Sequence, residues 1–471
     1  MSENELLLPH DEIATSSHES TVPNYLPSLK AFRMHDIQLE PSIPSDSLIT
    51  PTINTFPKNV IPRVTPVSTD QFMQVVEDVR EAITLGIHPI LISKGSSGSY
   101  FCRNKFEEIV GVFKPKDEEP YGNMNPKCMK WIHRNLFPCC FGRDALIPNL
   151  GYISEAAASF IDSRLRLGIV PRTEIVCLAS PVFSYTKSQL GAHIRKHKPL
   201  PLKIGSFQLF VKGYMDASSA FFKGYDKLNA QESSNEDSFW TADEQQGFRL
   251  SFEKMVILDY LIRQTDRSMD NWLIKDITNE DNRREISYVL LAHYNSHNNP
   301  SKARVIIAFC YYSSRYAHCL IDRLAAIDNG LAFPFKHPDS IRSYPYGWTL
   351  LPISNIPFSK EAKSIILPFL TSQMWWQETY LGLHLLFSLD DDFTESLFTK
   401  QLSVIRGQSL NLIEILNRCE SPSKLVQRTL VTVVEETETG LGLFTKRGKE
   451  SLEKVKRRIK EWKSTPLFTS C

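Results

Sequence analysis

Between residues 88 and 114 the chain alternates apolar and polar positions, with the period of two that is typical of strands. Gly95-Ser-Ser-Gly98 separates the first two of these stretches, and glycines in such a position favour a tight turn. Similar stretches recur further along the chain. The predicted strands cover residues 88–94, 99–102, 108–114, 173–178 and 206–211. The pattern therefore predicts an antiparallel meander with a glycine loop at its first bend.

A helical period, with apolar residues three and four positions apart, dominates the chain after Gly213. Before that point it predicts one helix over residues 154–167, with Ser154 as its N-cap and Gly168 as its stop. Later helices are predicted over residues 252–262, 368–386 and 402–416. The fold class is predicted as α+β, with a smaller, mainly antiparallel-β lobe followed by a larger, mainly α-helical lobe.

The chain has 471 residues, more than a single hydrophobic core usually supports, so several parts are predicted. Residues 1–66 hold nine of the 28 prolines and show no sustained period, which predicts a disordered arm. The other predicted parts are an N-lobe at 67–210 with an inserted loop at 121–150, a C-lobe at 211–430 and a basic tail at 431–471.

The basic tail has apolar residues at helical spacing among six Lys and Arg residues, namely Leu452, Val455, Ile459 and Trp462. This spacing predicts a basic amphipathic helix. Such a helix would suit an anionic membrane surface or a helix-binding partner, and the alternative is a solvated, charged tail.

Charge and cysteine content exclude several classes of protein. Lys and Arg number 54 against 53 Asp and Glu, so the net charge of +1 provides no overall attraction to nucleic acid, and no nucleic-acid partner is predicted. The nine cysteines form no Cys-x-x-Cys pair and no secretory signal precedes them, which indicates a reducing compartment. No apolar run approaches the ~20 residues of a membrane-spanning helix, so any membrane contact is predicted to be peripheral.

A short motif near the start of the chain suggests a sorting function. Glu3 is followed four positions later by Leu7 and Leu8, the acidic dileucine pattern that adaptor complexes bind. The alternative is that these leucines occur there by chance.

Three features could together bind and transfer a phosphate. In Gly95-Ser-Ser-Gly98-Ser99 the glycines would let the backbone approach an anion, to which amides and hydroxyls could donate. Lys114 ends the third predicted strand, where its ammonium could neutralise nucleotide phosphates. Asp266 and Asn271 are five positions apart, and Asp328 precedes Asn-Gly. Carboxylate and amide oxygens in this order are typical of kinases that bind ATP with a divalent cation.

Each feature alone has a simpler interpretation, namely a Gly-Ser hairpin, a solvated lysine or a capped turn. The combination of motifs is more specific. The motifs are Gly95-Ser-Ser-Gly-Ser-Tyr-Phe101, Val112-Phe-Lys-Pro-Lys-Asp-Glu-Glu-Pro-Tyr121, Cys139-Cys-Phe-Gly-Arg-Asp144, Pro171-Arg172, Gly205-Ser-Phe-Gln-Leu-Phe-Val211, Thr265-Asp-Arg267, Asp270-Asn-Trp-Leu-Ile-Lys275 and Ala326-Ile-Asp-Asn-Gly-Leu-Ala-Phe-Pro334. From about residue 93 to residue 427 the chain resembles the type II phosphatidylinositol 4-kinase family.

The resemblance implies a two-lobed, kinase-like fold that transfers the ATP γ-phosphate to the inositol 4-hydroxyl of phosphatidylinositol. The product would be phosphatidylinositol 4-phosphate. It also implies a peripheral, acylated protein on the cytosolic face of the trans-Golgi network and of endosomes.

The resemblance assigns roles by matching position. The implied ATP-binding residues are Gly95, Ser96, Ser97, Gly98, Ser99, Phe101, Lys114, Phe210, Val211 and Leu331. Phe101 and Leu331 would sandwich the adenine, while the backbone of Phe210 and Val211 would form the hinge contact. Asp266 would orient or deprotonate the inositol hydroxyl. Asn271 and Asp328 would bind Mg²⁺, with Mn²⁺ as the alternative ion. Glu119 and Glu155 are both candidates for the acidic partner of Lys114.

Two stretches depart from the family pattern. The family typically has a palmitoylated Cys-Cys-Pro-Cys-Cys, of which this chain keeps Cys139 and Cys140; both are lipidation candidates, and the alternative is plain thiols. The 57 positions from Asn271 to Asp328 exceed the interval that the family usually has, and residues 289–322 resemble nothing familiar. This insertion could be a surface loop, a regulatory element or a segment that misplaces Asp328.

Two other functions are consistent with these residues. A kinase fold impaired by the insertion could serve as a membrane and trafficking scaffold. A protein kinase would share the phosphate chemistry, but the His-Arg-Asp and Ala-Pro-Glu signatures are missing from the chain.

Overall fold

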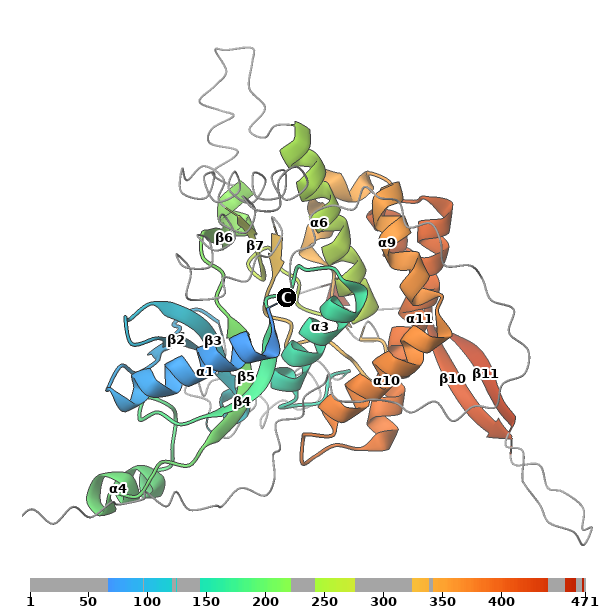
Figure 1. Ribbon diagram of the computed structural model, residues 1–471. Coiled ribbons are helices and arrows are strands. Elements are labelled where there is room, and N and C mark those ends of the chain that lie inside the picture. The colour runs from blue at the N-terminus through green and yellow to red at the C-terminus, as the bar shows by residue number, and fades with distance from the viewer. Residues whose placement is uncertain are drawn as a thin grey trace, which may run out of the picture. The chain divides into compact units, whose positions relative to one another are not determined.

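The computed structural model describes residues 67–95, 97–120, 124, 145–221, 242–275, 324–338, 342–438, 454–462 and 468–469 (Figure 1). The chain divides into two units, Met1–Ile53 and Asn54–Cys471, and every described element belongs to the second unit. Several predictions therefore lie outside the described residues: the disordered arm, the dileucine motif, Ser96, Cys139, Cys140 and the insertion at 289–322.

The N-terminal part contains a five-stranded antiparallel sheet with the strand order β1-β2-β3-β5-β4 (Figure 1). Its strands are β1 (Ile90–Leu91), β2 (Tyr100–Arg103), β3 (Ile109–Pro115), β4 (Thr173–Leu178) and β5 (Lys203–Leu209). All five lie where the sequence predicts strands. β1 is shorter than predicted; it is an edge strand that pairs with β2 alone.

Helix α1 (Thr69–Thr84), which was not predicted from the sequence, packs against this sheet. Ser68 and Gln71 form a capping box at its start, and its apolar residues recur at helical spacing. Phe72 and Val76 are buried with Phe113 and Phe207 in one hydrophobic cluster, so α1 and the sheet share a core.

The rest of the described chain is mainly helical and includes a second, small sheet of order β6-β7-β8. Its strands are β6 (Tyr214–Asp216), β7 (Trp272–Lys275) and β8 (Leu324–Ala326). The helices are α3 (Gly151–Leu165), α4 (Lys187–Lys196), α6 (Ala242–Leu261), α9 (Lys360–Leu370), α10 (Gln373–Phe387), α11 (Glu395–Arg418) and α12 (Pro422–Leu425), with 3-10 turns η1 (Lys116–Glu118), η2 (Gly347–Leu350) and η3 (Pro352–Asn355). Together these elements confirm the predicted α+β class, with antiparallel sheets and a helical C-terminal part.

Two helix predictions need correction. The segment 368–386 was predicted as one helix but forms the end of α9 and most of α10, because the Ser372 side chain accepts a hydrogen bond from the Trp375 N–H and starts a new helix. Ser154 was predicted to cap α3 but lies inside it, since the helix begins at Gly151. The carboxylate of Glu119 caps α3 instead, accepting from the N–H groups of Gly151 (3.1 Å) and Tyr152 (2.7 Å).

The predicted amphipathic helix in the tail is wrong, because residues Lys454–Trp462 form strand β11. β11 pairs antiparallel with β10 (Leu430–Glu438), whose β-branched residues favour a strand partner. The register also places acidic positions opposite basic ones, such as Glu435 opposite Arg457. Further on, β12 (Phe468–Thr469) pairs parallel with β9 (Arg342–Ser343).

Candidate active site

Lys114 lies near the end of β3, and its ammonium contacts two carboxylates from distant parts of the chain. Its Nζ forms an ion pair with Glu155 on α3 and another with Asp328, at 2.9 Å. Glu155 is buried, and its second oxygen accepts a hydrogen bond from the Asn329 N–H at 3.0 Å. Burial alone would lower the pKa of Lys114, but the charges of Asp328 and Glu155 outweigh it and raise this pKa above its ordinary value. Lys114 is therefore held as a fixed cation at the end of the sheet.

The choice between Glu119 and Glu155, which the sequence left open, is made by the structure. Glu155 pairs with Lys114, whereas Glu119 caps the helix that carries Glu155. Burial raises the pKa of Glu119 to about 7 against the opposing effect of the two backbone amides. Glu119 thus positions α3, and the charge of Lys114 slightly lowers the pKa of Glu119.

The glycine loop between β1 and β2 requires glycine at two positions for different reasons. One glycine has a positive φ, and the other has no room for a side chain. Gly95 adopts φ of +92°, a region that L-residues with a side chain rarely occupy. At Gly98 a Cβ would lie 2.6 Å from a carboxylate oxygen of Glu118, so no side chain fits there. Ser97 and Ser99 are joined by a hydrogen bond between their hydroxyls (3.1 Å). The loop can thus come close to an anion, with two hydroxyls beside it.

Asp266 and Asn271 lie in a loop between α6 and β7, and hydrogen bonds between residues of this loop hold its conformation. The Asn271 side-chain amide donates to the Asp266 carbonyl at 2.6 Å, which leaves the Asn271 amide oxygen available as a ligand atom. The backbone N–H of Asp266 donates to the Gln264 side chain at 3.2 Å. Asp270 in the same loop forms an exposed ion pair with Lys94 (3.4 Å), next to the glycine loop.

Asp328 follows β8 and is held close to the same loop. Its φ of +55° is left-handed, which Asp tolerates better than most residues. Its carbonyl accepts from the Gln264 side chain at 3.1 Å, and the Ile327 N–H donates to the Asn271 carbonyl at 3.2 Å. The long interval after Asn271 therefore does not displace Asp328, because β8 pairs with β7 directly after the loop that holds Asp266 and Asn271.

Residues predicted around the adenine occupy two neighbouring regions. Phe101 on β2 meets Phe210 edge to face, with 6.0 Å between ring centroids. The N–H of Phe210 donates to the Val110 carbonyl at 3.0 Å, so a hinge contact at Phe210 would use its carbonyl and the amide of Val211. Leu331 contacts the loop that holds Asp266 and Asn271, since its carbonyl accepts hydrogen bonds from the N–H (3.0 Å) and hydroxyl (2.7 Å) of Thr265.

The donor set was tested for its fit to a divalent cation. In the part of the chain that the structure describes, no group of three His, Cys, Asp or Glu side chains is arranged to hold a metal ion. The Asp328 carboxylate is about half exposed, and Asn271 supplies an amide oxygen from the adjacent loop. Two hard oxygen ligands of this kind fit a cation that arrives with nucleotide phosphates, which complete its coordination.

Sequence reasoning gave no role to Arg267, which connects the two loops. Its side chain is fully buried and forms a salt bridge with Asp259 on α6 (2.9 Å). It also donates to the backbone carbonyls of Asn271 and Ile327 and to the side chain of Asn329. The signal available in the sequence was an aspartate, Asp259, among the apolar residues of a predicted helix, because a buried carboxylate requires a buried cation.

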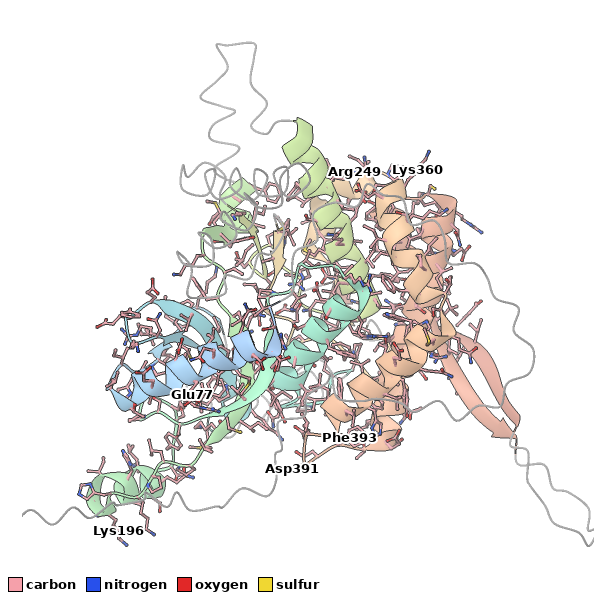
Figure 2. All side chains as sticks on the ribbon, in the orientation of Figure 1. Glu77, Lys196, Arg249, Lys360, Asp391 and Phe393 are labelled. Carbon is pink, nitrogen blue, oxygen red and sulfur yellow. The ribbon has the colours of Figure 1, made fainter. Side chains whose placement is uncertain are left out.

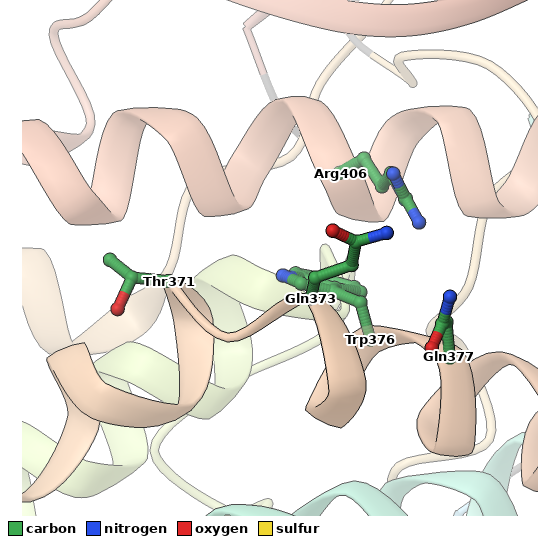
Figure 3. Close-up of a pocket in the computed structure, with 5 residues that line it drawn as sticks. All are labelled: Thr371, Gln373, Trp376, Gln377 and Arg406. Carbon is green, nitrogen blue, oxygen red and sulfur yellow. The ribbon is translucent and has the colours of Figure 1, made fainter. Parts of the chain in front are cut away.

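A hollow in the surface lies between the start of α10 and α11 (Figure 3). Its volume is about 220 Å³, and it is lined by Thr371, Gln373, Trp376, Gln377 and Arg406. The Arg406 guanidinium lies over the Trp376 ring, 5.3 Å from its centroid. None of the residues around Lys114 lines this hollow, so it is separate from the site described above.

A glycine loop, a lysine paired with an acid, and two loops carrying Asp266, Asn271 and Asp328 are the arrangement that phosphoryl transfer by a kinase requires. The sequence profile for phosphatidylinositol 3- and 4-kinases matches residues 95–409, which is more than half of the chain. This protein therefore belongs to the phosphatidylinositol 3- and 4-kinase family. Membership implies that it uses ATP and a divalent metal ion, and that a phosphatidylinositol is its substrate.

Individual relatives cover most of the chain. It is 39% identical over 415 residues to phosphatidylinositol 4-kinase type 2-beta of Rattus norvegicus, covering 85% of this chain and 79% of that protein. It is 40% identical over 381 residues to phosphatidylinositol 4-kinase type 2-alpha of Danio rerio, with 77% of each chain covered. The type 2-alpha protein of Xenopus laevis is 41% identical over 379 residues, with 77% and 73% covered. Across the described segments, none of the helices combines the length and apolar character that a bilayer crossing requires.

Proposed function

We propose that this protein is a 1-phosphatidylinositol 4-kinase, which transfers the γ-phosphate of ATP to the 4-hydroxyl of phosphatidylinositol. The observation that carries the proposal is the meeting of Lys114, Glu155 and Asp328 at one point, beside the loop that holds Asp266 and Asn271. The similarity to type 2 phosphatidylinositol 4-kinases supports the choice of substrate and of hydroxyl. The proposal includes a nucleotide-binding lobe over residues 67–210 and a catalytic lobe over residues 211–430.

The residues suggest how this chain would perform the transfer. The glycine loop and Lys114 hold the phosphates, so that the charge on the transferred group is neutralised without movement of the protein. Asp266 accepts the proton of the inositol hydroxyl. At the same time the hydroxyl oxygen forms a bond to the γ-phosphorus, and the bond between the γ-phosphorus and the ADP oxygen breaks. Buried Arg267 keeps the two loops at a fixed separation. Most of the rate enhancement would then come from position and charge rather than from covalent chemistry.

Asn271 and Asp328 are the residues that would bind Mg²⁺, with Mn²⁺ as the alternative. Such a cation would draw negative charge away from the transferred group. Lys114 also forms an ion pair with the Asp328 carboxylate. Binding of the charged nucleotide would therefore redistribute this ion pair.

The location of the enzyme is proposed from sequence alone. Acylation of Cys139 and Cys140 would hold it on the cytosolic face of trans-Golgi and endosomal membranes, since two acyl chains anchor a protein far more stably than one. Glu3, Leu7 and Leu8 would recruit adaptor complexes. All five residues lie outside the described part of the chain.

The proposed role of Asp266 is tested with the Asp266→Ala variant. Labelled ATP is supplied with phosphatidylinositol vesicles, and the phosphorylated position is identified on the deacylated head group. We expect label at position 4 with the parent chain, and turnover lower by roughly 10³-fold or more in the variant because the proton acceptor is gone. ATP binding should persist, since Lys114 keeps its ion pairs with Glu155 and Asp328 in the variant. A fully active variant, or label at another position, would show that this assignment is wrong.

A further inference from the structure

Helix α4, between β4 and β5, has a mostly exposed surface. None of its ten residues is buried, and Figure 2 shows the labelled Lys196 at its C-terminal end. It is nevertheless a well-defined helix, with a capping box formed by Thr186 and Gln189 and a left-handed C-cap at His197. None of its residues belongs to the hydrophobic clusters of the described residues, so its exposed surface needs another explanation.

The charge of this segment is of one sign. No Asp or Glu occurs between residues 175 and 215, whereas Lys187, Arg195, Lys196 and Lys198 are all exposed. The nearest carboxylates at its base, Asp117 and Glu118, are already paired with Lys203. The chain as a whole is almost neutral, so this cationic patch is a local feature.

Apolar side chains lie among these cations. Ile194 on α4 is 65% exposed and Leu202 after it is 60% exposed. Ile194 follows Leu190 by four positions, so both project from the same face of the helix. Exposed aliphatic side chains surrounded by Lys and Arg are the composition that binds the interface of an anionic bilayer. A solvated surface helix would have no need for the aliphatic groups.

The segment is held rigidly at its base. Buried Glu118 accepts hydrogen bonds from the N–H (2.9 Å) and hydroxyl (3.2 Å) of Ser184 before α4, and it pairs with Lys203 after it (3.2 Å). The Tyr185 hydroxyl donates to the Pro201 carbonyl at 3.0 Å and closes the base further. The same turn, η1, leads into the predicted inserted loop that begins at residue 121.

We propose that residues 187–202 form a docking surface for an anionic lipid bilayer, in which Lys187, Arg195, Lys196 and Lys198 contact head groups and Ile194 and Leu202 enter the interface. The inference rests on the proposed function, because an enzyme acting on phosphatidylinositol must reach a lipid embedded in such a surface. Charge complementarity and the exposed aliphatic residues select a lipid surface over an acidic protein as the occupant.

The test compares two variants that each lose three positive charges. The first is Arg195→Gln/Lys196→Gln/Lys198→Gln in the α4 segment, and the control is Lys360→Gln/Lys400→Gln/Lys424→Gln on α9, α11 and α12. All six side chains are exposed, so both proteins should fold as the parent does, which thermal unfolding checks. Figure 2 shows that Lys360 lies well apart from Lys196. The full chain is purified from bacteria, so that its cysteines carry no acyl group.

Flotation with vesicles of phosphatidylcholine, with and without phosphatidylserine, provides the measurement. We expect the α4 variant to bind anionic vesicles on the order of 100-fold more weakly than the parent, since each of the three basic residues contributes about fivefold near such a surface. The control should change less than about threefold, and Ile194→Ser should weaken binding without changing the dependence on salt. Equal binding by the parent and the α4 variant overturns the proposal, as does an equal loss in both triple variants.

A second measurement separates this proposal from the proposed function. Phosphatidylinositol dispersed in neutral detergent micelles is offered to the parent and to the α4 variant. Equal formation of phosphatidylinositol 4-phosphate, together with weaker vesicle binding, supports a docking role. Lower micelle activity in the α4 variant overturns it, because the segment would then act in the catalytic site. If the parent forms no product at all, the proposed function fails while flotation still decides the docking proposal.

Discussion

Arg267 and Asp259 carry charges that are fully buried from water. Arg267 is buried and neutralised by Asp259. It also donates hydrogen bonds to the backbone of the loop that holds Asp266 and Asn271 and of the Asp328 loop. A buried ion pair of this kind adds little net stability, but the loss of one partner would leave an uncompensated charge. Lysine could not replace Arg267, because a single ammonium cannot reach four acceptors at fixed angles. The spacing of the two loops depends on this one guanidinium.

Glu119 offers a test of buried charge at the residue scale. Its pKa is raised to about 7, well above that of an unfolded glutamate, so between about pH 4.5 and pH 7 the folded protein holds a proton that the unfolded chain has lost. This contribution to stability is complete at low pH and disappears as the pH rises through 7. We expect the free energy of unfolding of the parent to fall by about 2 to 3 kcal/mol relative to Glu119→Gln over this interval.

Urea unfolding of both proteins between pH 5 and pH 8 measures this difference. The glutamine variant keeps one acceptor for the α3 cap and removes the titrating group, so all other titrations cancel in the comparison. Parallel pH profiles for the two proteins would contradict the assignment of a raised pKa to Glu119.

Elements in this fold are positioned by contacts that local sequence does not encode. α3 begins at Gly151 because Glu119, more than thirty residues earlier, satisfies its first amides. β11 is a strand because β10 is available to pair with it. The β10 strand in turn lies against α11, where the two backbones approach closely at one glycine (Figure 1).

Gly407 tests this close approach at the scale of elements. A Cβ at this position would lie 1.7 Å from the carbonyl oxygen of Val431 on β10, and a backbone atom cannot move aside as a flexible side chain can. Gly407→Ala should therefore destabilise the protein by about 1 to 3 kcal/mol, although alanine is the better helix former.

Thermal or urea unfolding measures the effect, and Thr399→Ala on the exposed side of the same helix is the control, expected to stay within about 0.5 kcal/mol of the parent. If Gly407→Ala were as stable as the parent, α11 and β10 could not be packed as closely as described.

At the scale of the whole molecule, the site is assembled from segments that are distant in sequence. Lys114 comes from the five-stranded sheet, Glu155 from α3, and Asp328 from the end of the small sheet, more than two hundred positions after Lys114. The pairing of β7 with β8 makes this possible, because Trp272 lies opposite Ala326 and so brings Asn271 and Asp328 together. Whatever connects the two strands, their register fixes the site.

This arrangement leads to a prediction about the insertion. Deletion of residues 289–322 leaves β7, β8 and a connection of 14 residues (276–288 and 323) intact. Since the strand pairing holds Asp328, we expect kcat and the KM for ATP to change by less than about threefold. The vesicle assay with labelled ATP compares the shortened chain with the parent. A loss of activity in a shortened chain that still folds would show that the insertion takes part in catalysis.

The sequence alone determined the class of fold and the chemistry available to it. Alternation predicted the five strands of the first sheet, and the order of Gly95, Lys114, Asp266, Asn271 and Asp328 predicted a kinase site, because periodicity and motif spacing are local properties of a chain. Only the tertiary structure decided which acid meets Lys114. Glu119 is five positions from Lys114 and Glu155 is 41, yet packing assigns the nearer carboxylate to a helix cap and the farther one to the lysine. It also made a strand of the basic tail, since strand pairing depends on a partner that the local pattern does not contain.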